Sequence, residues 1–270
     1  MISSSGLFWQ RTHRSVSLAL LLYIGGCGYS EYEMRLNESK KYYSYLDKVE
    51  QSLAPKWVVP GNLMELRVPR QFNLIPPPPP AAPEDENAEK PIDPRQPDYV
   101  NLLFPGLFGA WEATFKVVKT DSSAEERRGY IYALSNYWEF AGEHAVDAGE
   151  FVTTLKDLLA EKLKIPMSDP RPEVYPTLSG SYHAQIPYDV CSFKGKEIDG
   201  VNYTFEVFAR TQGSVIGVIV TVLPEAMESP QKVSERIPLM LETFNFTKTP
   251  PKAGAEPNAP VQPAAGGAAF

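Results

Sequence analysis

Between Glu139 and Glu150, four acids surround one histidine. If residues 143–147 are helical, His144 and Asp147 lie three positions apart on one face, where they could share a proton or a divalent cation. A structural interpretation needs no such chemistry, because Asp147 and Glu150 have capping-box spacing and acids stabilise a helix amino terminus. His144 and Asp147 are therefore candidate catalytic residues, with helix capping as the alternative that the spacing favours.

A third candidate is His183, which follows two serines in the run Leu178-Ser-Gly-Ser-Tyr-His183. Serine and histidine could act as nucleophile and base, although Gly and Ser this close together are more typical of a turn. The sequence has no G-x-S-x-G, H-E-x-x-H, P-loop, G-x-G-x-x-G or paired C-x-x-C motif. We therefore expect no catalysis, no cofactor and no metal site. The alternative is a cell-envelope hydrolase or metal-dependent enzyme that uses His144 and the nearby carboxylates.

The amino terminus has the pattern of an export signal. Arg11 and Arg14 precede an apolar run over residues 16–24, and Gly25-Gly26-Cys27 follows it. The run has nine residues, whereas a helix that crosses a bilayer needs about 20. We therefore expect residues 1–26 to be a signal peptide that is removed on export.

Ile24-Gly25-Gly26-Cys27 resembles the lipobox of bacterial lipoproteins. The resemblance implies that Cys27 becomes the first mature residue and carries a diacylglycerol thioether and an amide-linked acyl chain, which together anchor a protein stably. Ordinary secretory cleavage is the alternative. Residue 28 is Gly rather than an acid, so the resemblance implies a lipoprotein that faces the periplasm, with the outer membrane preferred.

Charge and cysteine content narrow the possible partners. The formal net charge is −7, and it becomes −9 without residues 1–26, which hold two basic residues and no acid. Such a chain is a poor ligand for phosphate-rich nucleic acid, so we expect no nucleic-acid partner. With Cys27 lipidated, Cys191 is the one remaining thiol. We expect it to be a small buried hydrophobic residue, because no nearby cations are evident that would lower its pKa.

Composition divides the rest of the chain into four parts. Residues 27–63 read as a tether, in which an apolar stripe predicts a helix over about 32–53 that docks on the protein's own core or presents a ligand surface. Residues 64–247 read as one globular domain. It is interrupted at about 76–98 by a proline-rich insertion, either a solvated spacer or a docking site for an aromatic-lined groove. Residues 248–270 are low in complexity, so we expect a disordered tail.

Residue periodicity predicts an α+β fold with an antiparallel sheet of five to six strands packed with two main helices. One helix begins at Asp147 and ends before Pro166, and the other begins at Ser229 and is kinked by Pro238. Five longer strands are expected at residues 111–118, 130–140, 184–193, 201–211 and 214–223, and a short one at 64–68.

The two ends of the globular domain resemble those of PsbP-like domains. Leu66-Arg-Val-Pro-Arg-Gln-Phe72 is similar to the first strand and its Val-Pro-x-x-Phe continuation, and the segment 237–246 is similar to the closing helix. The resemblance implies a compact sandwich used for binding or assembly at a membrane surface. We therefore expect a lipid-anchored extracytoplasmic binding or assembly module, whose partners are the membrane and possible envelope proteins.

Overall fold

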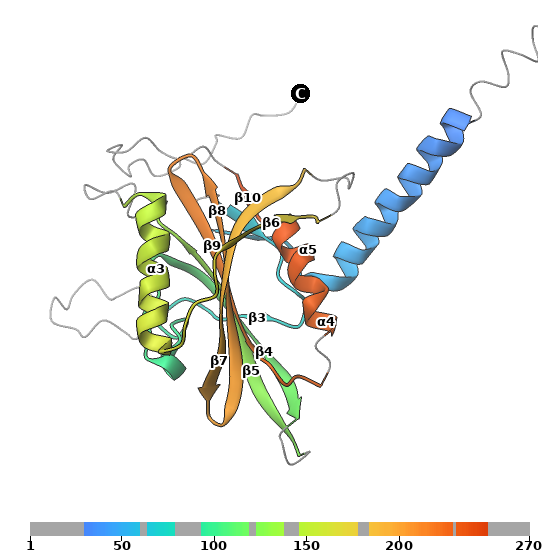
Figure 1. Cartoon of the computed structure of the whole chain (residues 1–270). Coiled ribbons are helices and arrows are strands. Elements are labelled where there is room, and N and C mark those ends of the chain that lie inside the picture. Colours follow the sequence, from blue (N-terminus) through green and yellow to red (C-terminus); the bar gives the residue numbers. More distant parts are fainter. Residues whose placement is uncertain are drawn as a thin grey trace, which may run out of the picture. The chain divides into compact units, whose positions relative to one another are not determined.

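The structure is a computed structural model of the chain, shown in Figure 1. It describes residues 30–59, 64–78, 93–118, 123–137, 146–177, 184–228 and 231–247. The predicted signal peptide, the middle of the proline-rich insertion and the predicted tail lie outside these residues, so their assignments stay predictions.

The chain divides into two compact units, Met1–Gln51 and Ser52–Phe270. The described part of the first unit is helical from residue 30, and the helix continues to residue 52. It contains neither Pro nor Gly, which accounts for its length. A helix was expected at about 32–53, whereas its use as a tether stays a prediction. In the described ranges, no helix is both long and apolar enough to span a membrane.

Two antiparallel sheets make up most of the second unit. The larger has seven strands in the order β3-β4-β5-β9-β8-β7-β6, and the smaller has three in the order β1-β2-β10. The strands of the larger sheet are β3 (Asn73–Leu74), β4 (Leu107–Val118), β5 (Ala124–Ser135), β6 (Arg171–Tyr175), β7 (Ile186–Ile198), β8 (Val201–Gln212) and β9 (Val215–Pro224). Those of the smaller sheet are β1 (Trp57–Val58), β2 (Met64–Leu66) and β10 (Asn245–Phe246). The predicted α+β class with an antiparallel sheet is confirmed.

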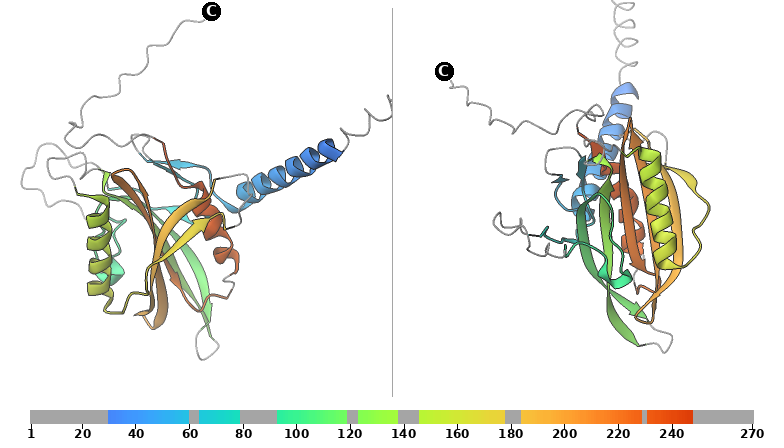
Figure 2. Two further views of the ribbon diagram at one scale, coloured as in Figure 1. Left: turned by 45° about the horizontal axis from the view of Figure 1, so that its top comes forward. Right: turned by 90° about the vertical axis from the view of Figure 1, so that its left-hand side faces the viewer.

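The larger sheet is covered by different elements on its two faces (Figures 1 and 2). On one face lies α3 (Ala148–Leu163), which buries Phe151, Leu155, Leu159 and Leu163 in the main hydrophobic core. On the other face lie α4 (Gln231–Ser234) and α5 (Arg236–Thr243). A single 3-10 turn, η1 (Asp98–Val100), precedes β4. The sheet is thus the middle layer of the second unit.

The helix boundaries follow from their capping residues and from proline. Asp147 is the N-cap of α3, and its carboxylate accepts a hydrogen bond from the Gly149 N–H at 3.3 Å. Lys164 ends the helix in the left-handed conformation. The predicted kink occurs where α4 and α5 are separated at Glu235. Pro238 has no N–H to donate to the carbonyl of Ser234 one turn earlier, so the helix breaks there.

The hairpin of β4 and β5 is longer than its sequence suggested. A polar turn was expected over residues 120–129, but β5 already begins at Ala124 and ends at Ser135, before the predicted end at 140. Its charged residues pair instead of forming a loop. Arg128 contacts Glu112 on the neighbouring strand at 3.2 Å, and Arg127 contacts Glu125 at 3.0 Å. Such pairs stabilise a solvent-exposed ribbon that hydrophobic patterning alone does not reveal.

The carboxyl end of α5 is held closely against the sheet. Gly217 of β9 lies under Phe244, and a Cβ atom there would approach the Phe244 Cζ atom to 2.3 Å. The hydroxyl of Tyr188 donates to the carbonyl of Leu241 at 2.8 Å. Arg210 donates to the Phe244 carbonyl and lies 5.3 Å from the centre of the Phe246 ring. These contacts fix which part of the sheet the helix covers.

Candidate functional site

The predicted site residues are only partly described. Asp147 serves as the N-cap of α3, as the capping interpretation predicted, and its partner is Gly149 rather than Glu150. Cys27, His144 and His183 lie outside the described residues, so lipidation and histidine chemistry stay predictions. Within the described ranges, no three His, Cys, Asp or Glu side chains lie close enough together to hold a metal ion.

Cys191 is a free thiol buried in the core beneath α3. Burial raises the pKa of this thiol above its ordinary value, and the nearby charges of Lys156 and Arg171 only partly oppose that effect. A thiol with a raised pKa is a weak nucleophile. The expectation of a small buried hydrophobic residue at this position is confirmed.

Two neighbouring pockets open on the face of the sheet that carries α4 and α5. The polar pocket has a volume of about 560 Å³ and is lined mainly by β8, β9 and the end of β7. The basic pocket has a volume of about 340 Å³ and lies between β4, the two helices and Gln71. Met227 lines both pockets. It follows β9 in a segment fixed to β4 by the Glu228 N–H, which donates to the carbonyl of Lys116 at 2.8 Å.

The floor of the polar pocket is formed by Glu206 and Thr221, which lie opposite one another on β8 and β9. Ser192 on β7 lies opposite Glu206 but outside the lining, and its hydroxyl is hydrogen-bonded to the hydroxyl of Ser168 at 3.1 Å. Burial raises the pKa of the Glu206 carboxyl, and the positive charge of Arg171 opposes this shift. Among the described residues, Glu206 makes no hydrogen bond or ion pair. Its carboxyl is therefore available to a ligand and holds a proton more readily than an exposed acid.

Thr221 is the more unusual of the two floor residues. It is 1% exposed, and its hydroxyl oxygen has no hydrogen-bond partner in the described part of the chain. At the rim of the same pocket the polar groups are paired. One Glu225 carboxylate oxygen accepts hydrogen bonds from the Thr204 hydroxyl and the Gly195 N–H, each at 2.8 Å. The polar groups at the floor are thus unpaired while those at the rim are satisfied.

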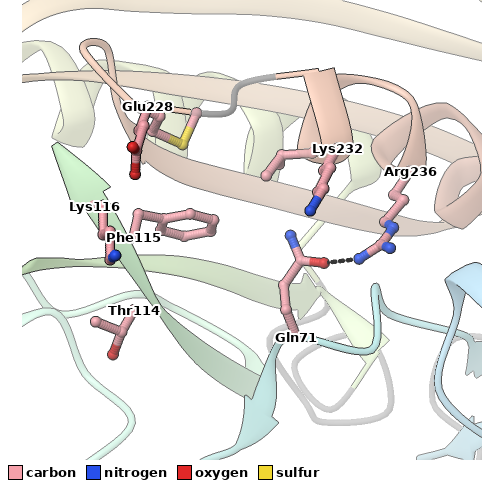
Figure 3. Close-up of a pocket in the computed structure, with 9 residues that line it drawn as sticks. Gln71, Thr114, Phe115, Lys116, Glu228, Lys232 and Arg236 are labelled. Atoms are coloured by element: carbon pink, nitrogen blue, oxygen red, sulfur yellow. Dashed lines mark hydrogen bonds between the residues drawn. The ribbon is translucent and has the colours of Figure 1, made fainter. Parts of the chain in front are cut away.

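The basic pocket gathers hydrogen-bond donors from three segments of the chain. Figure 3 shows Lys232 of α4, Arg236 of α5 and Gln71 facing the same space, with Phe115 and Lys116 of β4 alongside. Lys232 and Arg236 share a helical face because they are four residues apart. Arg236 donates a hydrogen bond to the Oε1 atom of Gln71. This arrangement can bind an anion.

Sequence reasoning missed both pockets. It placed Glu206 and Thr221 in strands without assigning them a role, although Thr221 is the only polar side chain in β9. It also left Lys232 and Arg236 as ordinary residues of the last helix. Their four-residue spacing was an available signal, but their closeness to Gln71 and Lys116 depends on contacts between distant segments, which spacing does not report.

No protein-family model matches the chain, and no curated protein matches it. Two solved structures overlap with it at low similarity. A Bacteroides thetaiotaomicron protein is 13% identical with a TM-score of 0.33, and the match covers 72% of this chain and 48% of that one. LpqN, described as involved in cell envelope biogenesis of Mycobacterium tuberculosis, is 11% identical with a TM-score of 0.32, over 68% and 83% of the two chains. The chain thus spans about half of the first protein, and neither overlap establishes a shared fold or function.

Proposed function

We propose that the protein is a lipid-anchored extracytoplasmic binding module that takes a small hydroxyl-bearing ligand into the polar pocket. The anchor is the lipid on Cys27, and the membrane it enters is a bacterial envelope membrane, with the outer membrane preferred and envelope proteins as possible further partners. The role is binding rather than turnover. Two members of the predicted acid and histidine cluster are described: Asp147 is used as the cap of α3, and Glu150 lies in the first turn of that helix.

The unpaired hydroxyl of Thr221 is the observation that supports the binding role. A buried polar group without a partner destabilises the folded state by about 1–3 kcal/mol. Such a group in a folded protein therefore needs an explanation, and ligand binding is one. Thr221 lies beside Glu206, whose carboxyl is also unpaired within the described residues, and both line the same open pocket. A ligand hydroxyl can bond to the Glu206 carboxyl directly, and a small shift of the side chains over the buried Thr221 hydroxyl lets the ligand bond to Thr221 as well. Ligand binding would thereby satisfy both.

The lipid anchor is tested by mass spectrometry of the mature amino terminus of the wild type and of Cys27→Ser. The wild type should begin at Cys27 with the added mass of its acyl chains, whereas the variant should lack that mass and leave the membrane fraction. An unmodified Cys27, or a mature terminus elsewhere, contradicts the anchor.

The binding role is tested by thermal denaturation of the purified full chain with a panel of mono- and disaccharides, including glucose and N-acetylglucosamine. At least one sugar should raise the melting temperature of the wild type in a concentration-dependent way, because a ligand that binds only the folded state stabilises it. The same sugar should have a smaller effect on Thr221→Val. A panel without effect on the wild type, or with equal effects on both proteins, contradicts the polar pocket as the binding site.

A further inference from the structure

The lining of the basic pocket has a charge opposite to that of the whole protein. Lys232 and Arg236 contribute two positive charges, and Glu228 is the one acid of the lining, whereas the side chain of Lys116 alternates with Phe115 along β4 and points to the other face of the sheet. Within the described residues, neither Lys232 nor Arg236 forms an ion pair. The side chains that face the pocket therefore carry a formal charge of +1 in a chain whose formal charge is −7. Two like charges beside one pocket repel one another, and an anion bound between them relieves that repulsion.

The donors of this pocket are oriented before a ligand arrives. The Arg236 guanidinium is held by its hydrogen bond to the Oε1 atom of Gln71. Because Oε1 accepts that bond, the amide nitrogen of Gln71 is left to donate, and Figure 3 shows it turned toward Lys232. The guanidinium keeps further N–H groups with which to bind an oxyanion. An oxyanion in the pocket thus meets donors of three side chains, Lys232, Arg236 and Gln71.

The size of the pocket and its apolar part restrict the ligand further. A volume of about 340 Å³ lies at the lower end of the range of about 300–1,000 Å³ for small-molecule sites. Phe115 and Val233 also line the pocket, which gives it an apolar part for an organic group next to an oxyanion. A phosphate monoester carries about −1.5 to −2 near pH 7 and has three acceptor oxygens, one for each of the donor side chains Lys232, Arg236 and Gln71. A carboxylate has two oxygens and one negative charge.

We propose that the basic pocket binds the phosphate of a phosphate monoester, on a soluble metabolite or on a lipid headgroup. The inference rests on the proposed binding function and names the charged end of the ligand. Because Met227 lines both pockets, one ligand can place its phosphate between Lys232 and Arg236 and its hydroxyl groups beside Thr221 and Glu206.

The test compares glucose 6-phosphate with glucose by titration calorimetry of the purified full chain. The two probes differ only in the phosphate, and we expect the phosphate to tighten binding by at least about tenfold, as charge-assisted hydrogen bonds do. Lys232→Gln should remove most of that difference, since its exposed side chain has no structural partner among the described residues. Lys156→Gln on α3 makes the same charge change on the opposite face of the sheet and should bind both probes like the wild type.

Two features of the titration separate a phosphate site from general attraction. The affinity for glucose 6-phosphate should fall as the pH drops through about 6, where the monoester takes up its second proton. Equal affinity for both probes, or equal loss in Lys232→Gln and Lys156→Gln, overturns the phosphate site. If glucose still binds in either case, the proposed binding function survives, whereas loss of binding to every sugar contradicts that function itself.

A second arm identifies the source of the phosphate. The Cys27→Ser protein, which lacks the lipid, is floated with vesicles of phosphatidylcholine that contain or lack phosphatidic acid. A lipid headgroup ligand predicts flotation that depends on phosphatidic acid and is lost in Cys27→Ser/Lys232→Gln. A soluble ligand predicts no flotation together with tight glucose 6-phosphate binding. Flotation that persists in the double variant, without phosphate-dependent titration, overturns the inference.

Discussion

Replacing Thr221 by valine should make the protein more stable, although a buried residue is changed. Valine has nearly the same shape as threonine and differs by a methyl group in place of the hydroxyl. The Thr221 hydroxyl has no partner among the described residues and is almost inaccessible to water. Removing an unsatisfied buried polar group recovers about 1–3 kcal/mol. Valine is also favoured in strands, so the backbone of β9 should not oppose the change.

Urea denaturation followed by tryptophan fluorescence measures this gain, since Trp57 and Trp111 lie in the second unit at 4.8 Å between ring centres. Thr204→Val is the matched control. The Thr204 hydroxyl donates to Glu225 at 2.8 Å, so its removal should cost about 0.5–1.5 kcal/mol. The two variants therefore shift the midpoint in opposite directions. In thermal denaturation, each kcal/mol should move the melting temperature by about 2–4 °C.

A fall in stability for Thr221→Val, or a change like that of Thr204→Val, contradicts the prediction that the Thr221 hydroxyl is unsatisfied. Either result means that the Thr221 hydroxyl is paired in the folded protein, for example through a buried water molecule. The support for a ligand in the polar pocket would then be lost. If the Thr221 hydroxyl serves binding and destabilises the folded state, Thr221→Val should be more stable than the wild type and should bind sugar more weakly.

Three other substitutions test single features of the fold and site. Asp147→Ala should lower the free energy of unfolding by about 1 kcal/mol, because the helix loses its cap. Asp147→Asn should leave it unchanged, since Asn also caps helices, and urea denaturation of both variants measures the difference. Gly217→Ala should cost about 1–3 kcal/mol through its clash with Phe244, measured as a lower melting temperature, and Phe244→Leu should reduce that cost. The pKa of Glu206 is higher in the folded protein than in the unfolded chain. The free energy of unfolding of the wild type therefore falls as the pH rises from the pKa of the unfolded chain to that of the folded protein. Glu206→Gln lacks this decline, so its advantage in urea denaturation should be larger at about pH 8 than at about pH 4.

Long elements with clear periodicity could be predicted from the sequence. In β8, Tyr203, Phe205 and Val207 alternate with more polar residues, which fixes both the strand and its core-facing side. In α3 the apolar stripe and the Asp147 cap gave the helix and its beginning. Local interactions dominate in both cases, so a short window of residues contains most of the relevant information.

The two-residue strands, and the packing of other elements on the sheet face away from α3, could not be predicted. The strands β1, β3 and β10 have two residues each and exist only because longer strands offer them hydrogen bonds. The alternation in β8 predicted one buried face and one solvent-facing side. In the structure Phe208, on the side away from α3, is buried, while Glu206 two residues away opens into the polar pocket. Alternation distinguishes two faces but does not say which part of a face another element covers.

The position of α5 therefore decides where a site can form. Its carboxyl end is held near Gly217 by the packing of Phe244 and by the bond from Tyr188 to Leu241. Thr221 lies four residues further along β9, about 13 Å away at 3.3 Å per residue. That part of the sheet lines the polar pocket and carries the unpaired groups of Thr221 and Glu206. A fold that needed only stability would place apolar residues there, so this part of the sheet, beyond the contacts of α5, is where ligand binding is expected.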